Sequence, residues 1–280
     1  MNRGRIDITR LNCVTKTVVW TSCNGLMLES DFFENRGDLY VTNPATNQHF
    51  ALPRFPCEEG FRCCACMSYA EASKQYKVSA ILTVGVDKSW RELRIKDTYG
   101  PYHTTTTRGF IHWQQNYPIG THVLSLNVET ETFRETRITT DGGRRLEKES
   151  DKYYASTGDA LTIFVARSEF SWEVMRMESE TGELRKVVKI DMEARLSKIE
   201  DFLPKPVGYV YQGGPRVGPV GWINYPEVLV LWVYSYGVCI YYNVRTQEIS
   251  YFTLEYPYRY HRFLFHINSL VWLDGCSAAS

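Results

Sequence analysis

The chain has no net charge and none of the short motifs that mark common catalytic sites. Its 32 Lys and Arg residues equal its 32 Asp and Glu residues, so it lacks the basic surface that nucleic-acid binding normally requires. It contains no nucleophile elbow, no phosphate-binding loop and no dinucleotide-binding glycine motif. Its six His are scattered and form no metal-binding pattern. We therefore expect no enzyme activity, no catalytic residue, no metal, no cofactor and no nucleic-acid partner.

The chain also lacks a long apolar run, and its first residues lead us to expect no signal peptide. Its most apolar stretch, 228–242, is 15 residues long and has Tyr-Ser-Tyr-Gly at its centre, which is too short and too interrupted for a membrane-spanning helix. Two buried strands joined by a turn at 234–237 are the better interpretation. The first residues, Met1–Ile6, lack the apolar core of a signal peptide. We expect no membrane partner and a location in the cytoplasm, the nucleus or both.

Eight Cys are present, but their spacing does not favour a metal site. Cys63, Cys64 and Cys66 cluster, yet no second pair follows at zinc-finger spacing and no His lies within thirty residues downstream. On a strand, Cys64 and Cys66 would share one face while Cys63 would point to the other. We expect buried, reduced thiols, with zinc binding, redox chemistry or a disulfide as the alternatives.

What the chain does contain is a recurring cassette, in which two apolar runs flank a polar turn with a Thr or Ser at a fixed place. The clearest copy is Leu39–Pro53. Further copies occupy Val123–Ile138, Trp172–Ile190 and Val238–Leu254, and a looser copy occupies Cys66–Ile81. The turn Thr or Ser falls at 46, 73, 130, 181 and 246. Hairpin units that recur about every 50 residues predict a propeller or a related radial array.

Composition and patterning predict a single all-β domain. Apolar residues make up 44% of the chain and aromatic residues 14%, which is enough to build a packed core. One hairpin cannot bury its apolar face alone, so several must stack. We predict a β-propeller or propeller-like array of antiparallel hairpins over 17–275, preceded by a lead-in segment at 1–16 and followed by a tail at 276–280. The weak helical period at 191–202 allows at most one short helix.

Several short motifs follow one another along this predicted domain. They are Cys23-Asn24-Gly25-Leu26, Leu39-Tyr40-Val41-x-Asn43-Pro44-x-Thr46, Tyr76-Lys77-Val78, Ser89-Trp90-Arg91, Gly109-Phe110-Ile111-His112-Trp113, Leu124-Ser125-Leu126 and Ser171-Trp172-Glu173-Val174-Met175. Their order and spacing over about residues 17–273 resemble the F-box-associated domain of plant F-box proteins.

This resemblance implies a kelch-like propeller that serves as the substrate-recognition module of an SCF-type ubiquitin ligase, acting in protein ubiquitination and degradation. In that family an F-box of some fifty residues precedes the Cys-Asn-Gly-Leu motif, whereas here 22 residues precede it. We therefore expect a Skp-type adaptor and a cullin to be reached only through a missing F-box or a partner. The alternatives are a stand-alone interaction module that competes with full-length F-box proteins and, less favoured, a propeller enzyme.

A recognition module is expected to bind its protein substrate with loops that rigid strands present. Three predicted loops, 97–107, 211–221 and 256–262, carry the aromatic and Arg residues that are enriched in binding hot spots. The candidate residues are Tyr99, Tyr102, His103, Tyr211, Arg216, Tyr256, Tyr258, Arg259, Tyr260, His261 and Arg262. The segment 256–262 is the strongest candidate, and the alternative is that these aromatics pack between blades.

Two other groups have a chemical and a structural interpretation. His112 could be a catalytic or ligand-binding residue, but on a buried strand we expect a hydrogen-bonded core histidine. The paired carboxylates Glu129/Glu131 and Asp191/Glu193 lie in or beside predicted turns, where we expect a solvated surface and no acid-base site.

Overall fold

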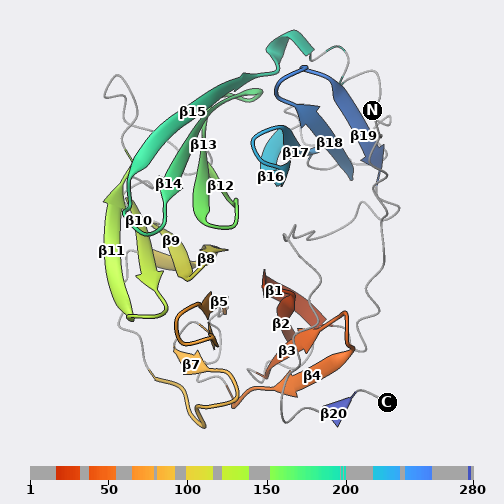
Figure 1. The fold of residues 1–280 in the computed structure, drawn as a ribbon. Helices are drawn as coiled ribbons and strands as arrows, with labels where there is room; N and C mark the ends of the chain where they lie inside the picture. The colour runs from red at the N-terminus through yellow and green to blue at the C-terminus, as the bar shows by residue number, and fades with distance from the viewer. Residues whose placement is uncertain are drawn as a thin grey trace.

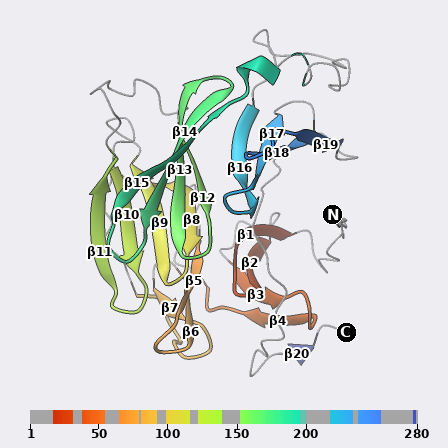
Figure 2. The same cartoon turned by 45° about the horizontal axis from the view of Figure 1, so that its top comes forward.

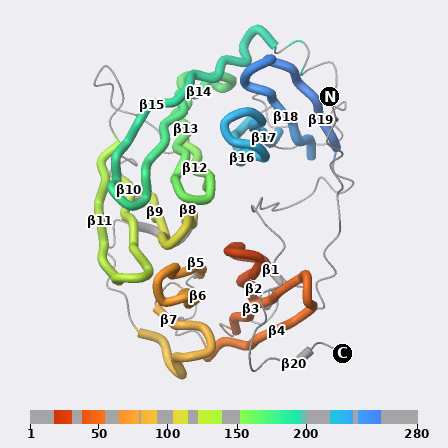
Figure 3. Tube along the Cα trace, in the orientation of Figure 1, coloured from red at the N-terminus to blue at the C-terminus, as the bar shows by residue number. Residues whose placement is uncertain are grey.

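A computed structural model describes residues 17–31, 38–54, 65–78, 81–91, 99–115, 122–138, 152–195, 197, 199, 217–233, 237–253 and 277–278. These residues form five antiparallel sheets, which are arranged around a common axis as the five blades of a β-propeller (Figure 1). The blades follow one another around the ring in sequence order (Figure 3). The predicted all-β, propeller-type fold is therefore confirmed.

Each blade takes one continuous portion of the chain, apart from a short C-terminal strand that joins blade 1. Blade 1 contains β1 (Thr17–Cys23), β2 (Leu26–Asp31), β3 (Leu39–Asn43), β4 (Gln48–Ala51) and β20 (Ser277–Ala278). Blade 2 contains β5 (Met67–Ala70), β6 (Gln75–Val78) and β7 (Leu82–Thr83). Blade 3 contains β8 (Tyr99–Thr107), β9 (Phe110–Gln115), β10 (His122–Asn127) and β11 (Thr132–Arg137).

Blades 4 and 5 have four strands each. Blade 4 contains β12 (Lys152–Ser156), β13 (Ala160–Ser168), β14 (Ser171–Glu178) and β15 (Leu184–Asp191). Blade 5 contains β16 (Val217–Asn224), β17 (Val228–Val233), β18 (Val238–Asn243) and β19 (Ile249–Thr253). In Figure 1 the first strand of each blade, namely β1, β5, β8, β12 or β16, lies nearest the axis.

The five sequence cassettes correspond to one hairpin in each of the five blades. Four of them form the hairpin of the third and fourth strands, which are β3–β4, β10–β11, β14–β15 and β18–β19. The looser copy forms β5–β6 of the three-stranded blade 2. The apolar stretch 228–242 belongs to β17 and β18, which pair antiparallel as predicted.

The described core lies between blades and not within them. Four clusters of buried apolar side chains occupy the seams between blades 1 and 2, 2 and 3, 3 and 4, and 4 and 5. The largest unites Phe164, Trp172 and Val174 of blade 4 with Trp222, Leu229, Leu231 and other residues of blade 5. A strand in the middle of a blade is covered on both faces, so its apolar residues form runs and do not alternate strictly with polar ones.

The prediction of a loop over 97–107 was wrong for residues 99–107, because these form β8. Thr104–Thr107 are β-branched residues that suit a strand, and they pair with Phe110–Trp113 of β9. Gly100 and Pro101, which suggested a loop, fall where the register shifts between Tyr99 and Thr104. Such an irregularity accommodates residues that a regular ladder rejects.

The predicted loop 211–221 was wrong for its last five residues, which open β16. Pro219 is tolerated there because β16 is the first strand of its sheet and has a neighbour on one side only. The weak helical period at 191–202 corresponds to a 3-10 turn at Glu193–Arg195, and residues 197 and 199 are helical as well. Within the predicted tail, β20 pairs with Gln48 and His49 of β4. The lead-in 1–16 and the predicted last strand 263–273 lie outside the described residues.

One set of turns from every blade gathers on one face of the ring, while turns between strands two and three, such as 169–170, lie on the other face. Because adjacent strands run in opposite directions, the turn between strands one and two and the turn between strands three and four emerge on the same side (Figure 2). We call this side the turn face. It comprises the turns at 24–25, 44–47, 71–74, 108–109, 128–131, 157–159, 179–183, 225–227 and 244–247.

Candidate recognition face

The residues predicted to contact a substrate are divided between strand β8 and parts of the chain outside the description. Tyr99, Tyr102 and His103 belong to β8, the first strand of blade 3, and not to a loop. Tyr211, Arg216 and the segment 256–262 lie outside the described residues. Contact with a substrate through these candidates therefore stays a prediction.

The turn face has a feature that the sequence only partly signals, namely a repeated backbone conformation. The residue that directly follows the fixed Thr or Ser has a positive φ in all five cassettes: 53° at Asn47, 57° at Lys74, 55° at Glu131, 72° at Gly182 and 57° at Gln247. Only one of the five is Gly, although this left-handed region costs other residues free energy. The fixed Thr or Ser marks the place in the sequence, but the left-handed residue itself has no consistent identity.

Three of these turns are closed by an Asn at their first position. The Oδ1 atoms of Asn43, Asn127 and Asn243 accept hydrogen bonds at 2.9–3.0 Å from the backbone N–H two residues further on. This is the Asx turn that the polar turn residues favour. The same shape is therefore built at three blades, and it holds the side chains between the Asn and the Thr in fixed positions.

Turns of blades 2 and 3 are tied to each other by carboxylates. Glu129 accepts hydrogen bonds from the backbone N–H of Ser73 at 3.1 Å and from its hydroxyl at 3.2 Å. Glu131 pairs with Lys77 at 3.0 Å and accepts two hydrogen bonds from Arg91 at 2.8 Å. The pair lies at an exposed turn, as predicted, and both carboxylates in addition bind the neighbouring blade.

These contacts favour the charged form of both carboxylates. The hydrogen bonds from Arg91, together with Lys77, lower the pKa of Glu131 from 4.5 to about 2. The backbone N–H of Ser73 lowers the pKa of Glu129. Both groups are therefore negative at neutral pH, where they fix the turn of blade 3 against blade 2.

Turns of blades 3 and 4 are joined as well, and a turn of blade 5 is held by a neighbouring segment. The backbone N–H of Arg108 donates to the carbonyl of Gly158 at 2.6 Å, which joins turns of blades 3 and 4. Arg134 of β11 donates to the carbonyls of Ser179 and Glu180 in the β14–β15 turn. Arg195 donates to Oε1 of Gln247 in blade 5 at 3.2 Å. The turns of blades 2 to 4 are thus interlocked, and the β18–β19 turn is held by the 3-10 turn that follows β15 of blade 4.

Behind the turn face a buried polar network links blades 2, 3 and 4. His112 of β9 contacts the hydroxyl of Ser125 through Nδ1 and that of Thr107 through Nε2, both at 2.8 Å. Thr107 also contacts the hydroxyl of Ser179 at 2.7 Å, and its carbonyl accepts from Ser68 at 3.0 Å. Burial lowers the pKa of His112 to about 3, so the imidazole is neutral. The prediction of a hydrogen-bonded core histidine is confirmed.

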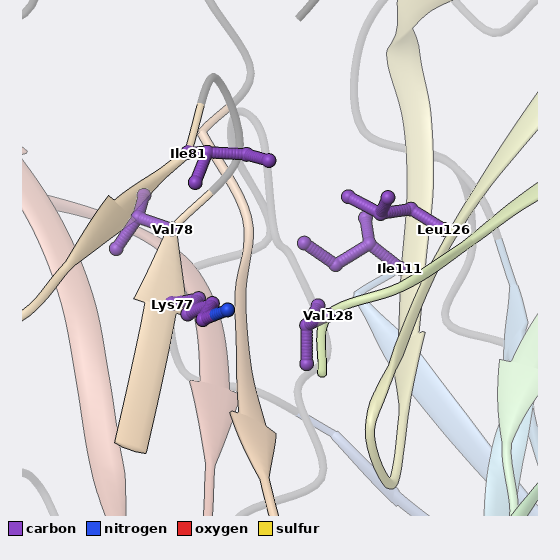
Figure 4. Close-up of a pocket in the computed structure, with 6 residues that line it drawn as sticks. All are labelled: Lys77, Val78, Ile81, Ile111, Leu126 and Val128. Atoms are coloured by element: carbon purple, nitrogen blue, oxygen red, sulfur yellow. The ribbon is translucent and has the colours of Figure 1, made fainter. Parts of the chain in front are cut away.

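A narrow crevice lies between blades 2 and 3, where Figure 4 shows Lys77, Val78 and Ile81 facing Ile111, Leu126 and Val128. All six side chains are buried, with Lys77 the most exposed at 8%. The space between them has no room for a water molecule. The crevice is therefore part of the packed seam between these blades and does not offer a ligand site.

Three of the Cys fall within the described residues, and none of them is part of a disulfide: Cys23, Cys66 and Cys239. Burial raises the pKa of Cys23 and of Cys239 to about 12, so both are protonated. Cys63 and Cys64 lie outside the description. Within the part of the chain that the structure covers, no three His, Cys, Asp or Glu side chains are placed to share a metal ion.

As to membranes, none of the helical segments among the described residues has the length and apolar character needed to span a bilayer.

No protein-family model and no curated protein matches this chain. Among solved structures it is similar to the streptogramin B lyase structure, with 17% identity and a TM-score of 0.35 over 79% of this chain and 66% of that chain. It is also similar to putative TolB from Agrobacterium tumefaciens, with 11% identity and a TM-score of 0.42 over 82% of this chain and 78% of that chain.

A third similar structure is the mitotic checkpoint complex, with 10% identity and a TM-score of 0.43 over 89% of this chain and 73% of that chain. At TM-scores this low none of these likenesses carries a functional inference. The assignment of the fold rests on the strand pairing itself. Propellers commonly serve as protein-interaction modules, but the fold hosts many functions, so function must be argued from the residues.

Proposed function

We propose that this chain is the substrate-recognition propeller of an SCF-type ubiquitin ligase and is related to the F-box-associated domains of plant F-box proteins. The motifs behind this resemblance fall at defined places in the fold. Asn24-Gly25 is the turn between β1 and β2, Asn43–Thr46 lies in the β3–β4 hairpin, and Phe110–Trp113 opens β9. Motifs that build successive blades in order support a common domain more than scattered matches would.

The observation that carries the proposal is the interlocked turn face. Each cassette supplies a hairpin whose turn is fixed by its own backbone conformation and, in blades 2 to 5, by contacts to another blade. A surface of fixed turns on a rigid scaffold suits the binding of a protein partner. In this role the chain does no covalent chemistry. It holds the substrate so that the local concentration of substrate lysines near a charged ubiquitin-conjugating enzyme rises.

The partners in this proposal are a protein substrate and, through an F-box or a bridging partner, a Skp-type adaptor and a cullin. The location would be cytoplasmic, nuclear or both. Affinity purification of the chain from its own cells, followed by mass spectrometry, tests this. Recovery of adaptor and cullin supports the ligase role, whereas recovery of other proteins without them indicates a stand-alone module or competitor.

A reconstitution provides the sharper test. The purified chain, adaptor, cullin, charged conjugating enzyme and the bridging partner recovered in the purification are combined with a captured substrate, and ubiquitin transfer to that substrate is measured with and without the chain. The proposal expects transfer that depends on the chain and that is competed by excess free chain. Equal transfer in both reactions would contradict it.

A further inference from the structure

A second feature of the turn face lies where blades 4 and 5 meet, and it begins with three residues in a row across blade 4. Ala155 of β12 lies opposite Thr162 of β13, and Thr162 lies opposite Arg176 of β14. Directly opposed residues of a sheet point to the same side. Ala155 and Phe164, which is two residues beyond Thr162, both pack in the seam with blade 5. Thr162 and Arg176 therefore also face blade 5.

Blade 5 contributes two aromatic side chains to the same place. Trp222 of β16 stacks on Phe164, with ring centroids 5.9 Å apart and an interplanar angle of 25°. Tyr225, in the turn between β16 and β17, meets Trp222 edge to face at 5.2 Å. The guanidinium carbon of Arg176 lies 5.6 Å from the centroid of the Tyr225 ring. Thr162, Arg176, Trp222 and Tyr225 thus surround one spot, which we call the 4–5 site.

The 4–5 site contains hydrogen-bond donors that have no acceptor among the described residues. Trp222 is 6% exposed and Thr162 is fully buried, yet neither the indole Nε1 nor the hydroxyl Oγ1 has a hydrogen-bond partner there. Nε of Arg176 is also buried and has no hydrogen-bond partner there. Buried donors are almost always paired, and an unpaired one costs free energy. Thr162 and Arg176 are neighbours on one face of blade 4, and Trp222 and Tyr225 lie against that face, so these donors line a region that suits an acceptor group.

The charge of Arg176 is only weakly compensated. Its Nη2 lies 3.4 Å from Asp159, and its Nε lies 3.5 Å from Glu178. Both separations exceed the 2.7–2.9 Å that is typical of a strong charge-assisted hydrogen bond. Asp159 is 64% exposed in the turn between β12 and β13, so it can move aside. The site therefore combines a cation that two carboxylates approach only loosely, two neutral donors and an aromatic wall.

We propose that the 4–5 site binds a carboxylate carried by an acidic side chain of a protein partner. A carboxylate offers only acceptor atoms, which matches a site with three donors, and a guanidinium can hold it in a bidentate manner. Arg176 and Tyr225 are partly exposed at the turn face, while Trp222 and Thr162 lie deeper, so the group enters from that face. The proposal concerns the propeller alone and holds whether or not the chain serves a ligase.

A titration of the purified chain with N-acetylglutamate tests the proposal. The reporter is the indole N–H signal of Trp222 in a proton–nitrogen correlation spectrum, identified by its loss in Trp222→Phe. We expect a saturable downfield shift of this signal. The neutral probe N-acetylglutamine should bind roughly tenfold more weakly, as should N-acetylglutamate with Arg176→Gln.

A matched control is Arg195→Gln, which removes another Arg at the blade 4–5 boundary but outside the 4–5 site. It should leave the titration unchanged. An unmoved indole signal with both probes, equal binding of the two probes, or equal weakening by the two Arg variants would each overturn the proposal.

A second variant, Asp159→Asn, tests the proposal even if Arg176→Gln does not fold. It removes the carboxylate that competes for Arg176, so we expect tighter binding of N-acetylglutamate. Unchanged or weaker binding would count against the site. Since no adaptor or cullin is present, failure here is distinct from failure of the ligase proposal.

Discussion

At the scale of single residues, Gly182 is a position where both the backbone conformation and the neighbouring side chains disfavour a Cβ atom. Its φ is 72°, and a Cβ there would lie 2.9 Å from Thr136 Oγ1 and 3.0 Å from Arg134 Cδ. The other four cassettes place a larger residue in the same backbone conformation. At Gly182 the neighbouring strand leaves no room for a Cβ, because Arg134 and Thr136 of β11 lie against this turn.

We expect Gly182→Ala to lower the free energy of unfolding by about 2–3 kcal/mol, since it adds a steric clash to the cost of the left-handed conformation. Gly158→Ala is the control, because φ there is 92° but nothing lies within 4 Å of the added Cβ. It should cost only about 1 kcal/mol. Urea unfolding of both variants measures the difference, and equal losses would refute the steric argument.

Buried hydroxyls provide a second test at this scale. Ser125→Ala leaves Nδ1 of the buried His112 without its partner, so we expect a loss of about 1–3 kcal/mol. Thr162→Val removes a buried hydroxyl that has no partner among the described residues, so stability should stay the same or rise by about 1 kcal/mol. Thermal and urea unfolding compare the two, and a loss for Thr162→Val as large as that for Ser125→Ala would contradict the unpaired state of Thr162.

At the scale of elements, the contact between the turn of blade 3 and blade 2 should depend on pH. The folded-state pKa of Glu131, about 2, lies below its ordinary value of 4.5. The contact therefore stabilises the fold fully above about pH 4.5, and this stabilisation is lost as the pH falls toward 2. Because Arg91 is 54% exposed, solvent screening limits the effect to about 1 kcal/mol.

The measurement is the difference in unfolding free energy between the native chain and Glu131→Gln as a function of pH. We expect about 1 kcal/mol at pH 7, shrinking steadily between pH 4.5 and pH 2. Glu180→Gln serves as a control, because its side chain is exposed in the corresponding turn of blade 4. A difference for Glu131→Gln that does not change with pH would contradict the ion pairs with Lys77 and Arg91.

Elements also show where sequence reasoning succeeded and where it failed. The hairpins were predictable because Asn, Thr and the flanking apolar runs determine local structure within a few residues. Strand β8 was missed because Gly100 and Pro101 resemble a loop, while the ladder that accommodates them is formed with β9. The roles of Glu129 and Glu131 were missed because their partners Ser73, Lys77 and Arg91 lie 40 to 56 residues away in the chain.

At the scale of the molecule, the repeat predicted a propeller but not the number of blades, which the five sheets now give. The 4–5 site could not be predicted, since Thr162 and Trp222 belong to different blades and neither lies in a recognisable motif. The residues proposed from sequence as the substrate contact, in 256–262, lie outside the described part of the chain and need their own test.

We expect the triple variant Tyr258→Ala, Arg259→Ala, Tyr260→Ala to reduce substrate capture at least tenfold if this segment is a hot spot. The control is Arg137→Ala, which changes an exposed residue at the end of β11 that lies away from the turn face. Quantitative co-precipitation with a substrate identified by the affinity purification measures both. If the triple variant still captures the substrate, the binding site lies elsewhere, and the 4–5 site is the next candidate.

The position of the core between blades limits which changes in sequence such a chain can accept during evolution. Each seam takes side chains from two blades, so a single blade excised from the ring would present bare apolar flanks and invite aggregation. Insertions or deletions of one whole blade are therefore disfavoured, while substitutions in the solvent-exposed middle of a turn leave the seams untouched. Related propellers should therefore keep the same number of blades and differ mainly in the sequences of their turns. Changes in the turns would alter which partner is bound without preventing folding.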